Sequence, residues 1–148
     1  MVERIQGKER TMEPQVTAAP QPPVANNTAA TADLNDKARN GQLDNARIVF
    51  TSHLMAHLVR NATNDLKRAA AKLLGQQQVM AKMRAATFHE DNDPHGEHDF
   101  GSLEHDDTKI FWKIDVYEND GTFQWGAAQP WDSETSYRIV TVMLASDY

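Results

Sequence analysis

The chain has 148 residues, no cysteine and a net charge of −6, and its mean hydropathy is −0.65. The lack of cysteine excludes disulfides and thiolate metal sites, and no segment approaches the run of roughly 20 apolar residues that a membrane-spanning helix needs. We therefore expect one soluble domain, a cytoplasmic location and no contact with membranes, since the N-terminus also lacks the apolar core of a secretory signal.

The N-terminal segment differs in composition from the rest of the chain. Residues 13–32 contain four of the six prolines, one charged residue and no aromatic residue. Proline removes backbone donors, and so little apolar surface cannot offset the entropy lost on ordering. We predict a disordered Pro/Ala-rich arm over residues 1–32 and a single α+β domain over residues 33–148.

The first predicted elements of the domain are short. A helix over residues 33–41 would be capped by Asp33 and ended by Gly41. Residues 47–52 are rich in β-branched and aromatic side chains and predict a strand. One or two helical turns are expected directly after this strand.

A long helix is predicted over residues 64–86. Six residues on it recur at intervals of three and four, which defines one mostly apolar face that we expect to cover a sheet. Much of the remaining surface of this helix is basic. The predicted face consists of Leu66, Ala70, Leu73, Gln77, Met80 and Arg84.

The second half of the chain predicts strands. Residues 100–104 and 109–118 would form a hairpin around a turn at 105–108, and 109–118 alternates between an apolar and a mixed face. Residues 122–125 could add a short strand, and 137–145 predict a buried strand because of their β-branched side chains. The expected fold is α+β, with a small, mostly antiparallel sheet packed against one long helix.

The charge is concentrated in residues 89–107, which contain eight carboxylates and no Lys or Arg. This segment carries −8, and the rest of the chain carries +2. Such a patch repels nucleic acid and favours a cation or a basic protein surface.

Imidazoles and carboxylates alternate within this segment, and together they are suitable ligands for a divalent transition metal. Pro94 and Gly96 exclude the helix on which histidine–glutamate zinc motifs depend. Asp115, on a neighbouring strand, could contribute, and Glu97 would be the base of a metal-dependent hydrolase. The alternative is a rigid loop whose histidines pair with nearby carboxylates. The candidate ligands are Asp93, His95, His98 and Asp99.

A second histidine pair, His53 and His57, is spaced by four residues, so a helix would place both on one face. That spacing is compatible with chelation of one metal ion. The alternative is a partly buried helix with two polar positions.

Three stretches, LNDKARNG with ARIVFTS, NDPHGEHDFG with FWKIDVYE, and RIVTVMLASDY, occur in this order over residues 33–148. Together they resemble a family of small uncharacterised proteins found mainly in alphaproteobacteria, often on plasmids and phages. The decapeptide NDPHGEHDFG is the most specific part. The resemblance implies a mobile-element setting and no particular reaction.

Trp125 and Trp131 lie next to Gly126 and Pro130, and exposed aromatic residues beside carboxylates are typical of protein-binding surfaces. We therefore expect a non-enzymatic module that binds a basic surface on a protein partner, as a counter-defence protein would. Alternatively, these two tryptophans cover one end of the core. A metal-dependent hydrolase and a minor phage structural component are the alternatives, and the oligomeric state is left open. The expected partner-binding residues are Glu104, Asp106, Asp107, Trp125 and Trp131.

Overall fold

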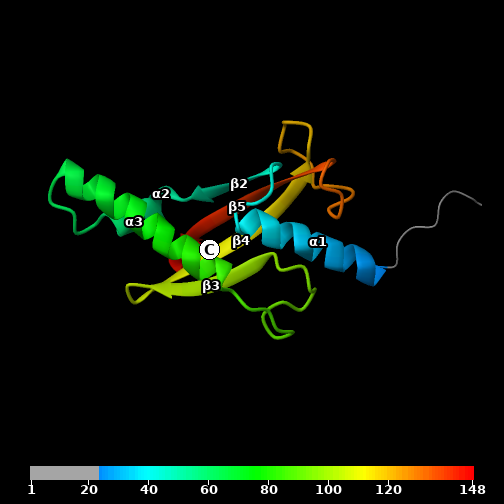
Figure 1. The fold of residues 1–148 in the computed structure, drawn as a ribbon, viewed down its shortest axis with the longest axis horizontal. Coiled ribbons are helices and arrows are strands. Elements are labelled where there is room, and N and C mark those ends of the chain that lie inside the picture. Colours follow the sequence, from blue (N-terminus) through cyan, green and yellow to red (C-terminus); the bar gives the residue numbers. More distant parts are fainter. Residues whose placement is uncertain (1–23) are drawn as a thin grey trace, which may run out of the picture.

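The computed structural model describes residues 24–148, with side chains from Asn27 onward, so most of the predicted arm lies outside the described residues. No helix in the described part is long and apolar enough to cross a membrane. Figure 1 shows the arrangement of the elements. They are α1 (Val24–Arg39), β2 (Ala46–Phe50), α2 (Ser52–Leu58), α3 (Asp65–Arg84), β3 (Phe100–His105), β4 (Thr108–Glu118), β5 (Ser136–Leu144) and the 3₁₀ turn η1 (Ala145–Asp147).

The α+β class is confirmed, with one four-stranded sheet in the order β2-β5-β4-β3. β3 with β4 and β4 with β5 are antiparallel, whereas β2 and β5 are parallel. The sheet is therefore mixed, not purely antiparallel. Parallel strands need a long connection that brings the chain back to the same end of the sheet. The segment between β2 and β5, which contains α2, α3, β3 and β4, provides this connection.

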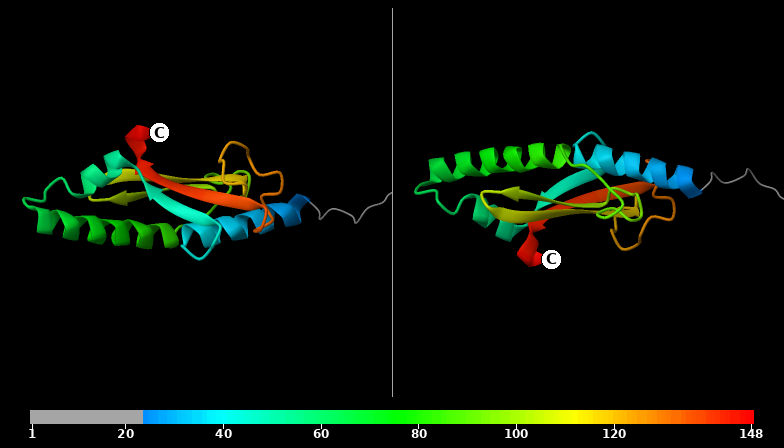
Figure 2. Two further views of the ribbon diagram at one scale, coloured as in Figure 1. Left: turned by 90° about the horizontal axis from the view of Figure 1, so that it is seen from above. Right: turned by 90° about the horizontal axis from the view of Figure 1, so that it is seen from below.

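Two helices, and not one, cover the sheet. α1 and α3 lie on the same side of it, and η1 lies on the other side (Figure 2). The buried core lies between the two helices and the sheet, and includes Ala38 of α1, Val79 and Met83 of α3, and Trp112 of β4.

The predicted boundary at residue 33 falls inside α1, so the assignment of residues 24–32 to a disordered arm is wrong. The prolines that suggested disorder end at Pro23, and the helix begins at the next residue. Thr31 and Ala32 are buried, so packing stabilises a segment whose composition alone predicts no structure. Asp33 is not the helix cap; it pairs with Lys37 at 3.2 Å. Gly41 ends the helix as predicted, with φ +73°.

α3 is confirmed within two residues at either end, and Asn64 caps it by accepting a hydrogen bond from the Lys67 amide. The predicted sheet-facing side is wrong. Gly75, Val79 and Met83, spaced by four, are the buried residues, while Leu66 and Leu73 are exposed. Gly75 allows the close approach of Leu58 from α2, whose Cδ2 would lie only 3.1 Å from an added Cβ.

The hairpin of β3 and β4 is confirmed, with both residues of its turn, Asp106 and Asp107, at positive φ (51° and 61°). Two consecutive left-handed residues form the turn type that matches strand twist, and aspartate tolerates it better than most residues do. The alternation of β4 is also confirmed, because Ile110, Trp112 and Ile114 are buried.

The C-terminal strand is confirmed as β5. The short strand expected over residues 122–125 is wrong, since only a single bridge joins Tyr117 to Gly126 there. Phe123 has a positive φ of 55°, which is incompatible with an extended strand.

We predict that Gly101→Ala strongly destabilises the fold, by about 3 kcal/mol or more, because overpacking forces a rigid side chain to move. An added Cβ would lie 2.3 Å from Cζ2 of Trp112, which is fully buried. Urea unfolding followed by circular dichroism measures this effect. Gly126→Ala is the matched control, since its nearest neighbour would be 4.0 Å away. Equal midpoints for the two variants would contradict the close packing of Trp112 beneath Gly101.

Candidate functional site

The acidic loop, residues 89–99, is fastened to α1 through His98. Nδ1 of His98 lies 2.9 Å from Oδ1 of Asp36, and Nε2 lies 3.6 Å from Oδ2 of Asp93. Asp93 also accepts the backbone amide of His98 at 3.2 Å. The imidazole therefore stands between two carboxylates, one from the loop and one from the helix.

Aromatic rings and a guanidinium enclose His98. The ring of Phe88 stacks on the imidazole, with centroids 4.0 Å apart and planes within 6°. The guanidinium of Arg39 lies over Phe88 at 5.0 Å and over Trp112 at 5.3 Å, and donates to Asp36 at 2.7 Å. Arg39 thus supplies positive charge next to the carboxylates around His98.

A second connection passes through the buried side chain of Asn35. Its amide donates to the carbonyl of Glu97 at 2.8 Å, and its oxygen accepts from Nε of Arg138 at 2.6 Å. Arg138 also donates to the hydroxyl of Ser136 at 2.9 Å and to the carbonyl of Pro130. Asn35 therefore joins α1, the acidic loop and β5.

Arg138 is fully buried, and no carboxylate of the described residues forms an ion pair with it. Burial lowers the pKa of Arg138 to about 10, partly opposed by the charge of Glu97. The guanidinium remains charged at neutral pH, so its neutral hydrogen-bond acceptors are essential.

This geometry suits a structural clamp better than catalysis. Both ring nitrogens of His98 face carboxylates, so neither is directed at a hydroxyl nucleophile. The rigid-loop alternative, in which histidines pair with nearby carboxylates, is therefore the one that the contacts of His98 favour.

The predicted metal ligands are only partly brought together. Asp93 and His98 are adjacent, but His95 is exposed, and the Asp99 backbone carbonyl accepts from the Ile114 amide at 2.8 Å at the start of the sheet. Within residues 24–148, no group of three or more His, Asp or Glu side chains could hold a metal ion. Asp115 pairs instead with Lys113 at 3.3 Å.

The histidine pair on α2 is likewise divided between two environments. His53 pairs with Asp147 of η1 at 2.9 Å. Nε2 of His57 is buried and has no hydrogen-bond partner in the described part of the chain. Burial, and secondarily the charge of Arg60, lowers the pKa of His57.

The predicted partner-binding residues lie at two ends of the molecule. Glu104, Asp106 and Asp107 are at the hairpin tip, whereas Trp125 and Trp131 are in the β4–β5 loop, residues 119–135. β4 separates them with eleven residues, about 35 Å at the usual rise of a strand. They cannot form one continuous surface.

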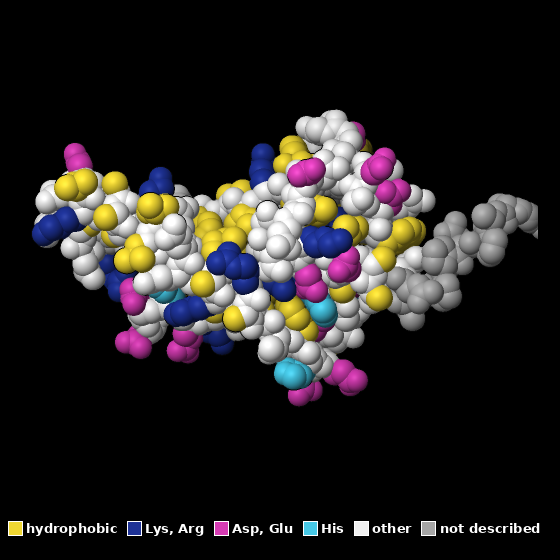
Figure 3. Space-filling model, in the orientation of Figure 1, with side chains coloured by type: hydrophobic (Ala, Val, Ile, Leu, Met, Phe, Trp, Pro, Cys, Tyr) yellow, Lys and Arg dark blue, Asp and Glu magenta, His cyan; other side chains and the backbone are white. Residues whose placement is uncertain are grey.

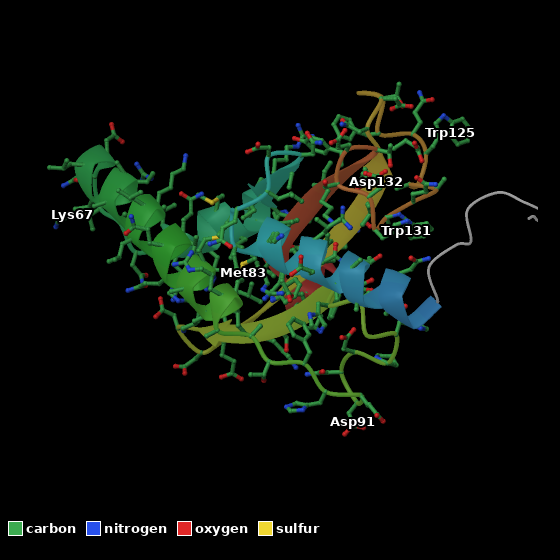
Figure 4. All side chains as sticks on the ribbon, turned by 45° about the vertical axis from the view of Figure 1, so that its right-hand side comes forward. Lys67, Met83, Asp91, Trp125, Trp131 and Asp132 are labelled. Atoms are coloured by element: carbon green, nitrogen blue, oxygen red, sulfur yellow. The ribbon has the colours of Figure 1, made fainter. Side chains whose placement is uncertain are left out.

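The two tryptophans also differ from each other. Trp125 is 65% exposed, while Trp131 is partly buried and lines a small cavity with Thr31 of α1 and Glu97. Figure 4 shows Trp125 pointing away from the ribbon and Trp131 close to α1. Only Trp125 is free to enter a pocket on a partner.

Sequence reasoning missed Asn35, Asp36, Arg39 and Arg138. A signal existed for Arg138, because the alternation of β5 places it on the same side as the buried Val140 and Val142. An inward-facing arginine predicts a polar partner in the layer above the sheet. No comparable signal identifies which residues of α1 supply that partner.

The profile of a family described as protein of unknown function (DUF3768) matches residues 58–147, more than half of the chain. The match includes the NDPHGEHDFG segment and begins after α1 and β2, so it covers less than residues 33–148. No curated protein and no solved structure matches the chain.

We predict that Asn35→Ala lowers the free energy of unfolding by about 2–4 kcal/mol, because it leaves the buried Nε of Arg138 and the carbonyl of Glu97 without partners. Chemical denaturation measures the loss. Lys37→Ala on the exposed side of the same helix is the control, with an expected effect below about 0.5 kcal/mol. A small loss for Asn35→Ala would refute its role as the joint between the three elements.

His57 predicts a pH effect on stability. The pKa of His57 is lower in the folded state than in the unfolded state. As the pH falls below about 6.5, the unfolded state therefore binds a proton at His57 before the folded state does. The free energy of unfolding decreases over this range until the pH reaches the lower pKa of the folded state. We expect His57→Gln to remove this part of the acid dependence. Thermal melts of both proteins from about pH 7.5 to 5 test it. Parallel curves of melting temperature against pH would refute the prediction.

Proposed function

Because the chain belongs to the DUF3768 family of proteins of unknown function, we propose its function from its own surface: it is a non-enzymatic module that binds a basic protein partner through Trp125 and the acidic β4–β5 loop. The observation that carries this proposal is the 65% exposure of an indole on a hydrogen-bonded loop. Exposed tryptophan is costly in water and is enriched among the residues that dominate binding energy.

The backbone around Trp125 is held in place. Its carbonyl accepts from the Glu118 amide at 2.9 Å, and the Ala127 amide donates to the carbonyl of Val116 at 3.0 Å. The carboxylate of Glu118 accepts from the Ala128 amide at 2.6 Å. The indole is thus presented by an ordered loop, which reduces the entropy lost on binding.

Phe123 is the side chain that anchors the loop to the sheet. Its ring lies 5.8 Å from Tyr117 and 5.4 Å from Tyr137, and the guanidinium of Arg47 lies 5.0 Å from its centre. Since Phe123 already covers these residues, Trp125 is not needed to shield this face of the sheet.

The charge around Trp125 supports a basic partner. Residues 118–135 contain four carboxylates and no Lys or Arg. Figure 3 shows acidic side chains gathered over this end of the molecule. Opposite charge on the partner would raise the association rate and select against acidic proteins. The four residues are Glu118, Asp120, Asp132 and Glu134.

The biological setting of the proposal comes from the resemblance to plasmid and phage proteins. In that setting, a cytoplasmic module that covers a basic surface of a host nucleic-acid-binding protein would act in counter-defence, since acidic residues compete with DNA for such a surface. If the partner is a phage particle protein, the same loop would instead serve assembly. The identity of the partner distinguishes these two roles.

We predict that Trp125→Ala weakens binding to the cognate partner by at least about tenfold while stability changes by less than about 0.5 kcal/mol. The experiment cross-links the full chain to its partners in an alphaproteobacterial host, identifies them, and measures the affinity of the purified pair. Binding should fall between about 0.05 and 0.5 M salt.

Tyr148→Ala is the matched control, because Tyr148 is an exposed aromatic residue directly after η1, outside the loop. Equal affinity for Trp125→Ala and the unmodified chain would rule out the loop as the binding site. A partner that binds without any dependence on salt would rule out the electrostatic part of the proposal.

A further inference from the structure

We propose that the outward face of α3 is a self-association surface, on which a second copy of this chain packs its own α3 in antiparallel orientation. Three of the large apolar side chains exposed in the described part of the chain lie on this helix. They are Leu66, Leu73 and Leu74, with exposed fractions of 81%, 60% and 56%. Contiguous apolar exposure of this kind marks interfaces.

These leucines belong to one stripe, defined as residues 66, 70, 73, 74, 77 and 81, which are all exposed. At about 100° per residue, the stripe is opposite the side that buries Val79 and Met83. It therefore points away from the sheet along most of the helix. Figure 3 shows apolar side chains on the projecting end of α3, beyond the sheet.

Within the described part of the chain, the first half of α3 packs against no apolar surface that would bury its leucines. Every residue from Asp65 to Ala70 is exposed, whereas burial in the second half recurs every four residues. An isolated helix half gains most of its stability from packing of an apolar face. A second helix laid along the stripe supplies that packing.

Charge complementarity identifies the second helix as that of another copy. Lys67 lies beside the stripe, and the acidic hairpin tip of the same chain lies beside the other half of α3. Within residues 24–148, neither Lys67 nor Asp107 forms an ion pair, and the side chain of Asp106 is 61% exposed. One copy thus presents an unpaired cation, Lys67, and two carboxylates, Asp106 and Asp107, beside one apolar stripe. Asp106 is exposed but lies 3.5 Å from Nε2 of His105 in its own chain.

A twofold axis perpendicular to α3 near Leu74 brings these charges together. Lys67, seven residues before Leu74, then faces the position of Ala81 in the second copy, seven residues after it. Ala81 lines a shallow depression with Gln78, Lys82, His105 and Asp106, and Lys82 there donates to the carbonyl of Glu104. Lys67 of each copy therefore meets the hairpin tip of the other, where Asp106 and Asp107 supply the negative charge. The same contact occurs twice, as an isologous interface requires.

This surface is separate from the proposed partner site. Lys67 and Trp125 lie at opposite ends of the molecule (Figure 4). Pairing through α3 therefore leaves both β4–β5 loops accessible, and the dimer would present two of them. Dimerisation through α3 does not depend on whether Trp125 binds a partner.

The test uses charge-reversed variants of the full chain in sedimentation equilibrium, from about 1 μM to 1 mM. We expect the unmodified protein to dimerise. Lys67→Glu alone, and Asp106→Lys with Asp107→Lys alone, should each weaken dimerisation by at least about tenfold, because like charges then face each other. An equimolar mixture of the two variants should form a heterodimer, since its two contacts are both attractive. Lys113→Glu, on the opposite face of the sheet, is the matched control and should dimerise normally.

Leu66→Ser with Leu73→Ser provides a second variant that leaves the monomer intact, because both side chains are exposed. It should weaken dimerisation without lowering the melting temperature measured at low concentration. If the unmodified chain stays monomeric at about 1 mM, the proposal is overturned. This holds also if the reason is that residues 1–23, and not a second copy, cover the stripe. A dimer that survives these substitutions, or a mixture that stays monomeric, overturns it as well.

Discussion

A buried guanidinium needs hydrogen-bond acceptors for its nitrogens, because losing its hydration without compensation would cost several kcal/mol. Arg138 is the third residue of β5 and is fully buried. It donates to Asn35 on α1, to Ser136 on its own strand and to the carbonyl of Pro130 in the β4–β5 loop. The positions of α1 and of that loop depend on this residue. Since Asn35 also holds the carbonyl of Glu97, the acidic loop depends on it indirectly.

The clamp around His98 extends the same network. Asp36 follows Asn35 on α1, and its carboxylate binds both His98 and Arg39. The decapeptide NDPHGEHDFG is thereby fixed against the helix layer, and its histidine is engaged in holding the fold. The most specific motif of the chain therefore has a structural explanation, while the binding surfaces that we propose lie elsewhere, on the β4–β5 loop and on α3.

These two surfaces follow from how the sheet is covered. α1 and α3 share one face, and α3 is longer than the part of the sheet beneath it, so its first half projects beyond the core (Figure 2). At the opposite end, Phe123 takes the aromatic position on the sheet and leaves Trp125 outside. In both cases, large apolar side chains are exposed because other residues already occupy the packed positions: Val79 and Met83 in the core, and Phe123 against Tyr117 and Tyr137 on the opposite face of the sheet.

The sequence by itself determined the positions of β2, α3, the hairpin and β5, because periodicity, turn residues and β-branched composition act over a few neighbouring residues. It also located the acidic segment and the hairpin turn at Asp106 and Asp107. Tertiary structure alone decided which face of α3 is buried: hydrophobicity favoured the leucines, but close packing against Leu58 selected the side with Gly75. It likewise decided that residues 24–32 are helical, and which polar residues of α1 meet Arg138 and His98. Those contacts join residues separated by 62 or more positions, and no local pattern encodes such a pairing.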